Sequence, residues 1–253
     1  VGSQHSNISH PKVLTLPRGI PLTWSNTHKI IWDTMRTTSG IVNAGSGRVD
    51  KPKLGGKDKL LFAASSKYGY RPRILKCISG KFTPDDFEGH INTPRRTKRQ
   101  AKTDRPTYYA KLATSRIGLS LPGLGYDCYR TWEILTMGVV LVVERGVGLD
   151  RTFWRLPVIK LSDFSEMTPQ LLRQAYVEAM YRRDDFEFER LHMSYWLQIL
   201  TDVSASRSID TMMARFPMEA EDSAHTRPLE YYDCGEKGEK CGPGTRRPPR
   251  EMC

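Results

Sequence analysis

The stretch PGLGYDCYRTWEILTMGVVLVVE, residues 122 to 144, decides the fold of this chain. It follows an apolar run that ends at Pro122, and its glycines predict a tight turn. Residues 127 to 136 then have helical spacing, and the apolar run 139 to 144 predicts a buried strand. A strand, a turn, a helix and a second strand in this order predict a parallel sheet.

The flanking sequence continues the alternation of strands and helices. Gly138 stands where a left-handed residue would end the helix, and Thr168 with Pro169 forms a strong helix start. Residues 81 to 106 are expected to form a long polar connection. We predict strands at 12–17, 59–64, 117–122, 139–144 and 157–161, and helices at 26–36, 71–79, 108–114, 127–136, 169–182 and 186–200. The fold class is therefore α/β, a Rossmann-like parallel sheet flanked by helices.

Composition divides the chain into three predicted parts. Residues 1–55 are expected to be the remnant of a first domain followed by a glycine-rich linker, because no periodicity is visible from 42 to 59. Residues 56–205 form the main Rossmann-like domain. Residues 206–253 are a C-terminal helix and an irregular tail rich in Cys, Gly and Pro.

Charge and cysteine content narrow the range of partners and compartments. The net charge of +11 favours a polyanionic or phosphate-bearing partner. The five cysteines lack a paired CxxC spacing, so no zinc or thioredoxin-like site is predicted. Three of them lie in the tail, where a disulfide would help, and Asn7-Ile8-Ser9 is a glycosylation sequon; both hint at an oxidising compartment. The apolar runs are too short to span a bilayer.

The turn and helix of the opening stretch form the candidate site. Gly123 and Gly125 allow the backbone to approach a ligand closely, and the helix start that follows offers unpaired amides to an anion. Arg130 can bind a diphosphate, and Glu133 on the same helix face can accept hydrogen bonds from the hydroxyls of a ribose. The alternative is that Arg130 and Glu133 form an ordinary ion pair on a solvated helix.

Other phosphate-binding motifs do not fit the sequence. Cys128 leaves a GxGxxG pattern incomplete, and Gly55-Gly56-Lys57-Asp58 lacks the spacing of a P-loop. The basic run 95–102 contains no aromatic residue for base stacking, so it does not predict a nucleic-acid site, and only the net charge supports nucleic-acid binding as a third hypothesis. A non-catalytic module that binds a polyanion such as a sulfated glycan stays open as an alternative function, through Arg95, Arg96, Lys98, Arg99 and Lys102.

The chain resembles the nucleotide-sugar-binding half of exostosin-like glycosyltransferases in three stretches: 71–75, 120–144 and 156–169. The family pattern P-G…R-x-x-E-A-L-x-x-G-x-x-P-V is matched by six residues: Pro122, Gly123, Arg130, Glu133, Leu135 and Gly138. The likeness covers about residues 59 to 182 of the chain. The chain departs from the pattern at two places: Ile134, in the predicted helix, replaces Ala, and residues 139–142 of the following strand lack Pro.

The resemblance implies a GT-B architecture and transfer of a hexose or pentose from a nucleotide diphosphate to a glycan or glycoprotein. Arg130 would bind the diphosphate, Glu133 the ribose, and Arg71 would be a second phosphate contact. No metal or other cofactor is expected. The catalytic base is unknown, because the family's first domain supplies it, and a fragment could be inactive. Family members act in the Golgi or endoplasmic reticulum lumen, so a membrane anchor outside this sequence is expected.

Overall fold

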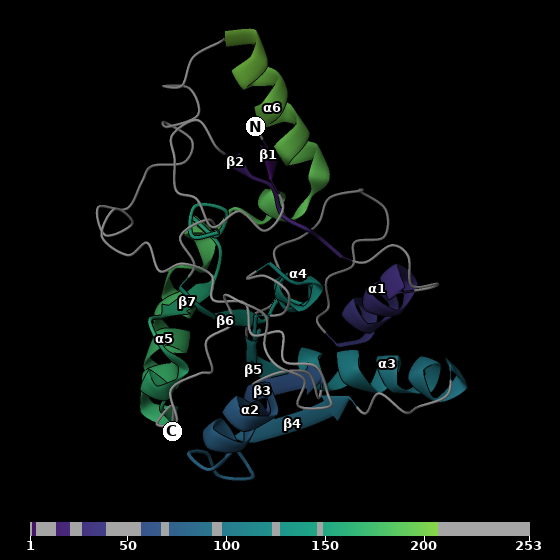
Figure 1. Cartoon of the computed structure of the whole chain (residues 1–253), viewed down its shortest axis with the longest axis vertical. Coiled ribbons are helices and arrows are strands. Elements are labelled where there is room, and N and C mark those ends of the chain that lie inside the picture. Colours follow the sequence, from purple (N-terminus) through teal and green to yellow (C-terminus); the bar gives the residue numbers. More distant parts are fainter. Residues whose placement is uncertain are drawn as a thin grey trace, which may run out of the picture.

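The computed structural model describes residues 2–3, 14–20, 27–38, 57–66, 71–92, 98–122, 127–145 and 149–206. Its centre is a five-stranded, all-parallel sheet with the strand order β4-β3-β5-β6-β7 (Figure 1). The strands are β3 (Lys59–Ser66), β4 (Phe87–Asn92), β5 (Ser115–Leu119), β6 (Val140–Glu144) and β7 (Val158–Leu161). The predicted Rossmann-like α/β fold is confirmed. Two short parallel strands, β1 (Gly2–Ser3) and β2 (Leu14–Thr15), pair separately.

Helices cover both faces of the sheet. They are α1 (Thr27–Thr38), α2 (Arg71–Ser79), α3 (Lys98–Ala113), α4 (Tyr129–Thr136) and α5 (Pro169–Tyr181), and the chain continues to a further helix, α6 (Met193–Ser206). Three short 3-10 turns, η1 (Phe164–Glu166), η2 (Arg183–Asp185) and η3 (Phe188–Leu191), connect the later elements. The predicted start of α5 is confirmed, because the Thr168 hydroxyl accepts a hydrogen bond from the Leu171 amide at 3.2 Å.

Alternation along the strands divides the core into two layers. In β3, Leu61 and Ala63 pack with α2 and α5, whereas Phe62 and Ala64 pack with α1, α3 and α4. Because successive side chains of a strand point to opposite faces, a strand buried on both faces is continuously apolar. This explains why the apolar runs at 59–64 and 139–144 identified central strands correctly.

Helix α4 lies directly on β5 because Gly118 leaves room for it. A Cβ at Gly118 would come within 2.9 Å of two side-chain atoms of Ile134. The helix ends at Thr136, and Gly138 follows with a φ of +64°, as predicted for a left-handed end residue. The chain then enters β6, so both ends of α4 are fixed by the sheet.

The predicted polar connection from 81 to 106 is wrong. It contains β4, which is an edge strand with β3 as its only sheet neighbour, and the first half of α3. An edge strand keeps polar residues, and here Glu88 of β4 pairs with Lys111 of α3. The single helix predicted over 186–200 is also wrong, because η3 and a break precede α6, which begins at Met193.

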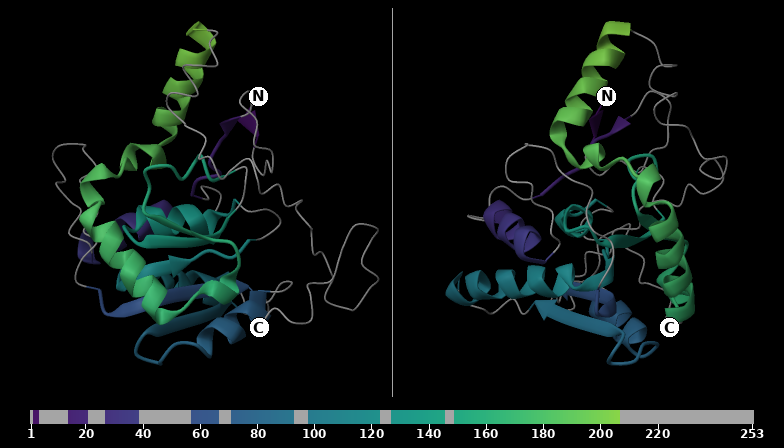
Figure 2. Two further views of the ribbon diagram at one scale, coloured as in Figure 1. Left: turned by 90° about the vertical axis from the view of Figure 1, so that its left-hand side faces the viewer. Right: turned by 180° about the vertical axis from the view of Figure 1, so that it is seen from behind.

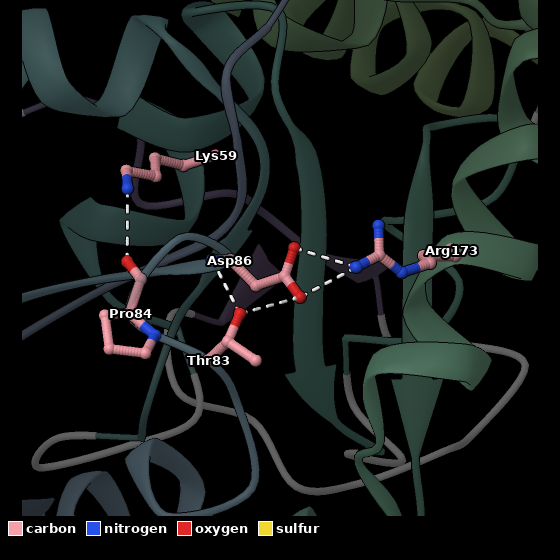
Figure 3. A network of polar contacts seen from close by, with 5 residues as sticks. All are labelled: Lys59, Thr83, Pro84, Asp86 and Arg173. Atoms are coloured by element: carbon pink, nitrogen blue, oxygen red, sulfur yellow. Dashed lines mark hydrogen bonds and ion pairs between the residues drawn. The ribbon is translucent and has the colours of Figure 1, made fainter.

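Polar contacts tie α5 to the beginning of β4. Arg173 donates from Nη2 to both carboxylate oxygens of Asp86, at 2.8 and 2.7 Å (Figure 3). In the same turn, Thr83 bonds to the Asp86 carboxylate at 3.2 Å, and Lys59 donates to the carbonyl of Pro84 at 3.1 Å. The helix is thereby joined to the amino-terminal side of the sheet, away from the ends at which the strands finish.

The N-terminal segments pack on the main sheet domain. Helix α1 lies beside α3 (Figure 1), and its Ile31 belongs to the core layer of α3 and α4. Helix α6 extends away from the sheet at the end of the molecule opposite β4 (Figure 2). The predicted linker from 42 to 56 and the tail from 207 onward lie outside the described residues, and the domain boundaries at 55 and 205 stay predictions.

Candidate functional site

The strand order reverses between β3 and β5, which marks the candidate site. From β3 the chain passes through α2 to β4 on one side, and it then returns through α3 to β5 on the other side. In open parallel sheets of this kind, ligands bind beyond the carboxyl ends of the strands at such a reversal. The segments that follow β3 and β5 at this edge lead into α2 and α4.

Arg71, the first residue of α2, reaches across to the end of β5. Its Nε donates to the carbonyl of Pro122 at 2.8 Å, and its Nη2 donates to the carbonyl of Leu121 at 3.3 Å. The side chain is partly buried. The predicted phosphate residue Arg71 therefore lies at the strand reversal, where its charge is fixed by two backbone acceptors.

The beginning of α4 meets the same strand end. Cys128, the residue before the helix, donates from Sγ to the carbonyl of Leu121 at 3.8 Å. Its sulfur also lies 3.0 Å from the hydroxyl of Ser120, which in turn lies 2.9 Å from the hydroxyl of Thr131. The helix starts α2 and α4 thus converge on one carbonyl group, from opposite faces of the sheet.

Asp127 lies just before α4 but does not cap the helix. The cap position is Cys128, and its side chain makes no capping bond. The buried carboxylate of Asp127 instead accepts from the indole of Trp132 and from the backbone amide of Arg18, each at 2.6 Å. The segment around Arg18 is thereby attached to α4, since the Arg18 guanidinium also lies 4.2 Å from the ring centroid of Tyr129.

Arg130, in the first turn of α4, holds a buried nitrogen without a hydrogen-bond partner. Its Nε is inaccessible to solvent and bonds to no atom of the described residues. Burial acts to lower the pKa of Arg130, but the neighbouring Tyr108, Cys128 and Glu133 outweigh it and raise that pKa. The guanidinium is therefore held charged beside Tyr108 and Glu133.

Glu133 faces α3 and is almost entirely buried, with 6% of its surface exposed. Its Oε1 accepts from the hydroxyl of Tyr109 at 2.7 Å, and its Oε2 accepts from the hydroxyl of Tyr108 at 3.2 Å. Arg130 and Glu133 form no ion pair within 4 Å in the described part of the chain. The solvated surface pair considered from the sequence therefore does not describe them. The predicted ribose contact stays a prediction, and each oxygen already serves a tyrosine.

Several predicted residues lie beyond what the structure describes. Gly123 and Gly125 belong to the segment 123–126, so the predicted phosphate turn stays a prediction. Of the basic run, Arg95 and Arg96 lie outside the described residues, and the backbone of Lys98, Arg99 and Lys102 belongs to α3. The predicted polyanion surface stays a prediction.

The sequence analysis missed Tyr108 and Tyr109 as members of the site. They are consecutive residues of α3, separated by more than twenty positions from the helix that they contact. A clue was available, because a tyrosine pair in a short apolar segment needs acceptors for both hydroxyls when it is buried. The only buried carboxylates in the next helix region are Asp127 and Glu133, among the residues that the structure describes.

Within the described ranges, no group of three or more His, Cys, Asp or Glu side chains could hold a metal ion. None of the helices in these ranges has the length and apolar character needed to cross a bilayer. A scan against protein-family models and a search of curated proteins gave no match to the chain.

Proposed function

We propose that this chain is the donor-binding half of a glycosyltransferase of the GT-B type. It would hold a nucleotide-diphosphate sugar at the reversal between β3 and β5, for transfer of a hexose or pentose to a glycan or glycoprotein. The proposal combines the sequence resemblance to exostosin-like enzymes with the bonds of Arg71 to the end of β5 and the buried Nε of Arg130 in the first turn of α4.

The buried, unpaired Nε of Arg130 is the observation that carries the proposal. A buried charged donor without an acceptor is costly, and a diphosphate oxygen is a suitable acceptor, since arginine binds phosphate through charge-assisted hydrogen bonds. Each such bond contributes roughly 1.5 to 3 kcal/mol. The start of α4 adds a smaller favourable contribution of about 0.3 to 2 kcal/mol for an anion.

Arg130 and Arg71 have a chemical role in the proposed transfer as well as in binding. When the bond from the sugar to the diphosphate breaks, negative charge builds up on the leaving diphosphate. Fixed guanidinium groups stabilise that charge, and no resident metal is needed in this proposal. The base for the incoming hydroxyl is unassigned, and the resemblance implies that the acceptor-binding domain supplies it.

A secretory-pathway location, in the Golgi or endoplasmic reticulum lumen, is part of the proposal. Cys77 of α2 is disulfide-bonded. Disulfides persist in oxidising compartments and are rare in the cytosol, so this bond supports a lumenal protein. An anchor encoded outside this sequence would attach it to the membrane.

Calorimetric titration of the full chain with UDP, GDP, ADP and CDP tests the proposal. We expect at least one nucleoside diphosphate to bind, and Arg130→Met to weaken its binding by about 10- to 100-fold, the equivalent of losing one charged hydrogen bond. Arg183→Met, which removes an exposed charge in η2, is the matched control and should leave binding unchanged. Equal binding by Arg130→Met, or no binding by the folded wild type, rejects the proposal.

A further inference from the structure

Glu133 is held by two tyrosines of α3. Tyr109 and Tyr108 donate to its two carboxylate oxygens at 2.7 and 3.2 Å, and the rings of the two tyrosines pack edge to face with centroids 4.9 Å apart. Both tyrosines are buried. Hydrogen bonds to both oxygens fix the orientation of the carboxylate.

Tyr108 links the carboxylate to Arg130. Burial is the largest cause that raises the pKa of Tyr108. The Glu133 carboxylate raises this pKa further, and the Arg130 guanidinium lowers it. The Tyr108 hydroxyl donates to Glu133, and Arg130 interacts electrostatically with both residues. Because Glu133 and Arg130 stand one helical turn apart on α4, the carboxylate also lies on the same side of the helix as the guanidinium.

A ribose would have to compete with the tyrosines for Glu133. If the ribose hydroxyls displaced them, two buried tyrosine hydroxyls would lose their acceptors, which is costly in a protein interior. If the ribose hydroxyls bound Glu133 alongside the tyrosines, they would have to reach a buried side chain. Only 6% of the surface of Glu133 is exposed. The burial and the two hydrogen bonds of Glu133 therefore favour a role in orienting neighbouring protein side chains over a role in binding the ribose.

We propose that Glu133, fixed by Tyr108 and Tyr109, is a positioning residue that holds the Arg130 guanidinium for the donor's diphosphate and does not contact the ribose. This inference rests on the proposed function. It assigns the buried cluster of α3 and α4 a specific part in diphosphate recognition, and it makes Tyr108 and Tyr109 determinants of that recognition.

Ligands with and without ribose hydroxyls separate the two roles of Glu133. Inorganic pyrophosphate, UDP and 2′,3′-dideoxy-UDP are titrated into wild type, Glu133→Gln and Tyr109→Phe, with GDP, ADP and CDP and their dideoxy forms in parallel. We expect Glu133→Gln to weaken pyrophosphate and the nucleoside diphosphate by the same factor, about tenfold. Tyr109→Phe should weaken both by a smaller common factor. A loss confined to ligands that carry ribose hydroxyls overturns the inference.

Tyr176→Phe is the matched control, because Tyr176 is a buried tyrosine on the opposite face of the sheet. Tyr176→Phe should leave the affinities for pyrophosphate, UDP and 2′,3′-dideoxy-UDP unchanged. An equal loss of affinity in Tyr176→Phe would show that the losses in the other variants come from a general loss of stability. A wild-type chain that binds neither pyrophosphate nor any nucleotide rejects the proposed function, and the role of Glu133 with it. Binding by wild type without a pyrophosphate effect in Glu133→Gln rejects the inference alone.

A double-mutant cycle tests the coupling without any ligand. Urea unfolding is measured for Arg130→Met, Glu133→Gln and the double variant. If Glu133 holds Arg130, the effects on the unfolding equilibrium constant are non-additive by about tenfold, as expected for residues of one buried network. Additive effects within about twofold overturn the inference.

Discussion

The Nε of Arg71 donates a 2.8 Å hydrogen bond to the carbonyl oxygen of Pro122. This bond joins the first turn of α2 to the chain just beyond β5, at the point where the strand order of the sheet reverses. It holds a positive charge at the edge where parallel sheets bind ligands. Arg71 therefore has a structural role and, in the proposed function, a role in binding the donor.

Replacement of Arg71 should lower both stability and donor affinity. Arg71→Met removes two hydrogen bonds to backbone carbonyls, and we expect a loss of about 1 to 3 kcal/mol in the free energy of unfolding. Arg71→Lys should recover only part of it, because one ammonium cannot reproduce the fork of the guanidinium. Urea denaturation measures the change. Lys76→Met, an exposed charge on the same helix, is the control, and equal losses in both variants would contradict the assignment.

Gly118 should be essential for seating α4. Gly118→Ala brings a Cβ within 2.9 Å of Ile134, and we expect a loss of about 1 to 3 kcal/mol in the free energy of unfolding from overpacking. The cost should largely disappear when Gly118→Ala is made in an Ile134→Ala background, where the opposing atoms are absent. Gly80→Ala, whose added Cβ would meet nothing closer than 3.5 Å, should be close to neutral. A Gly118→Ala cost that persists in the Ile134→Ala background would show that the contact is not its cause.

Asp127 should stabilise the attachment of the N-terminal segment to α4. Its two carboxylate oxygens accept from two N–H donors, at 2.6 Å each. Asp127→Asn places an amide NH2 against one of these donors, so we expect a loss of about 1 to 3 kcal/mol in the free energy of unfolding. Tryptophan fluorescence during urea unfolding measures it. The exposed Asp85→Asn serves as the control, and an equally small change in both variants would refute the role of Asp127.

The elements predicted correctly from the sequence are those with a strong local pattern. β3 and β6 are buried on both faces and therefore read as continuous apolar runs, and α5 begins with a Thr-Pro signal. β4 was missed because an edge strand carries polar residues, as Glu88 does. The contacts of Glu133 with Tyr108 and Tyr109 depend on the packing of α3 against α4, which no local pattern encodes. The sequence pointed to Arg71 and Arg130 as candidate phosphate-binding residues. It did not predict the hydrogen bonds that hold Arg71 at the end of β5.

Stability should depend on pH through Lys57. This buried lysine donates from Nζ to the carbonyl of Gly138 at 3.0 Å, and burial lowers its pKa from 10.5 to about 7. Between these two pH values the unfolded chain binds more protons than the folded chain, so the stability rises as the pH increases. It should level off below about 7 and above about 10.5.

Urea unfolding of wild type and Lys57→Met at pH 6, 8, 9 and 10 checks this dependence. The stability of wild type relative to Lys57→Met should increase by up to about 1.4 kcal/mol per pH unit within that window. The exposed Lys76→Met should follow the wild-type curve. A constant difference between wild type and Lys57→Met across the four pH values would contradict the assignment.

The central claim is that Arg130 and Arg71 receive the diphosphate of a nucleotide-sugar donor at the end of β5. A crystal structure of the full chain with the nucleoside diphosphate that binds in the calorimetric panel tests it most directly. If the proposed function is correct, we expect a diphosphate oxygen within about 3.2 Å of the Arg130 guanidinium. The phosphates should lie beside the starts of α2 and α4. A nucleotide bound elsewhere, such as along the basic run 95–102, or an Arg130 without contact to the phosphates would contradict it.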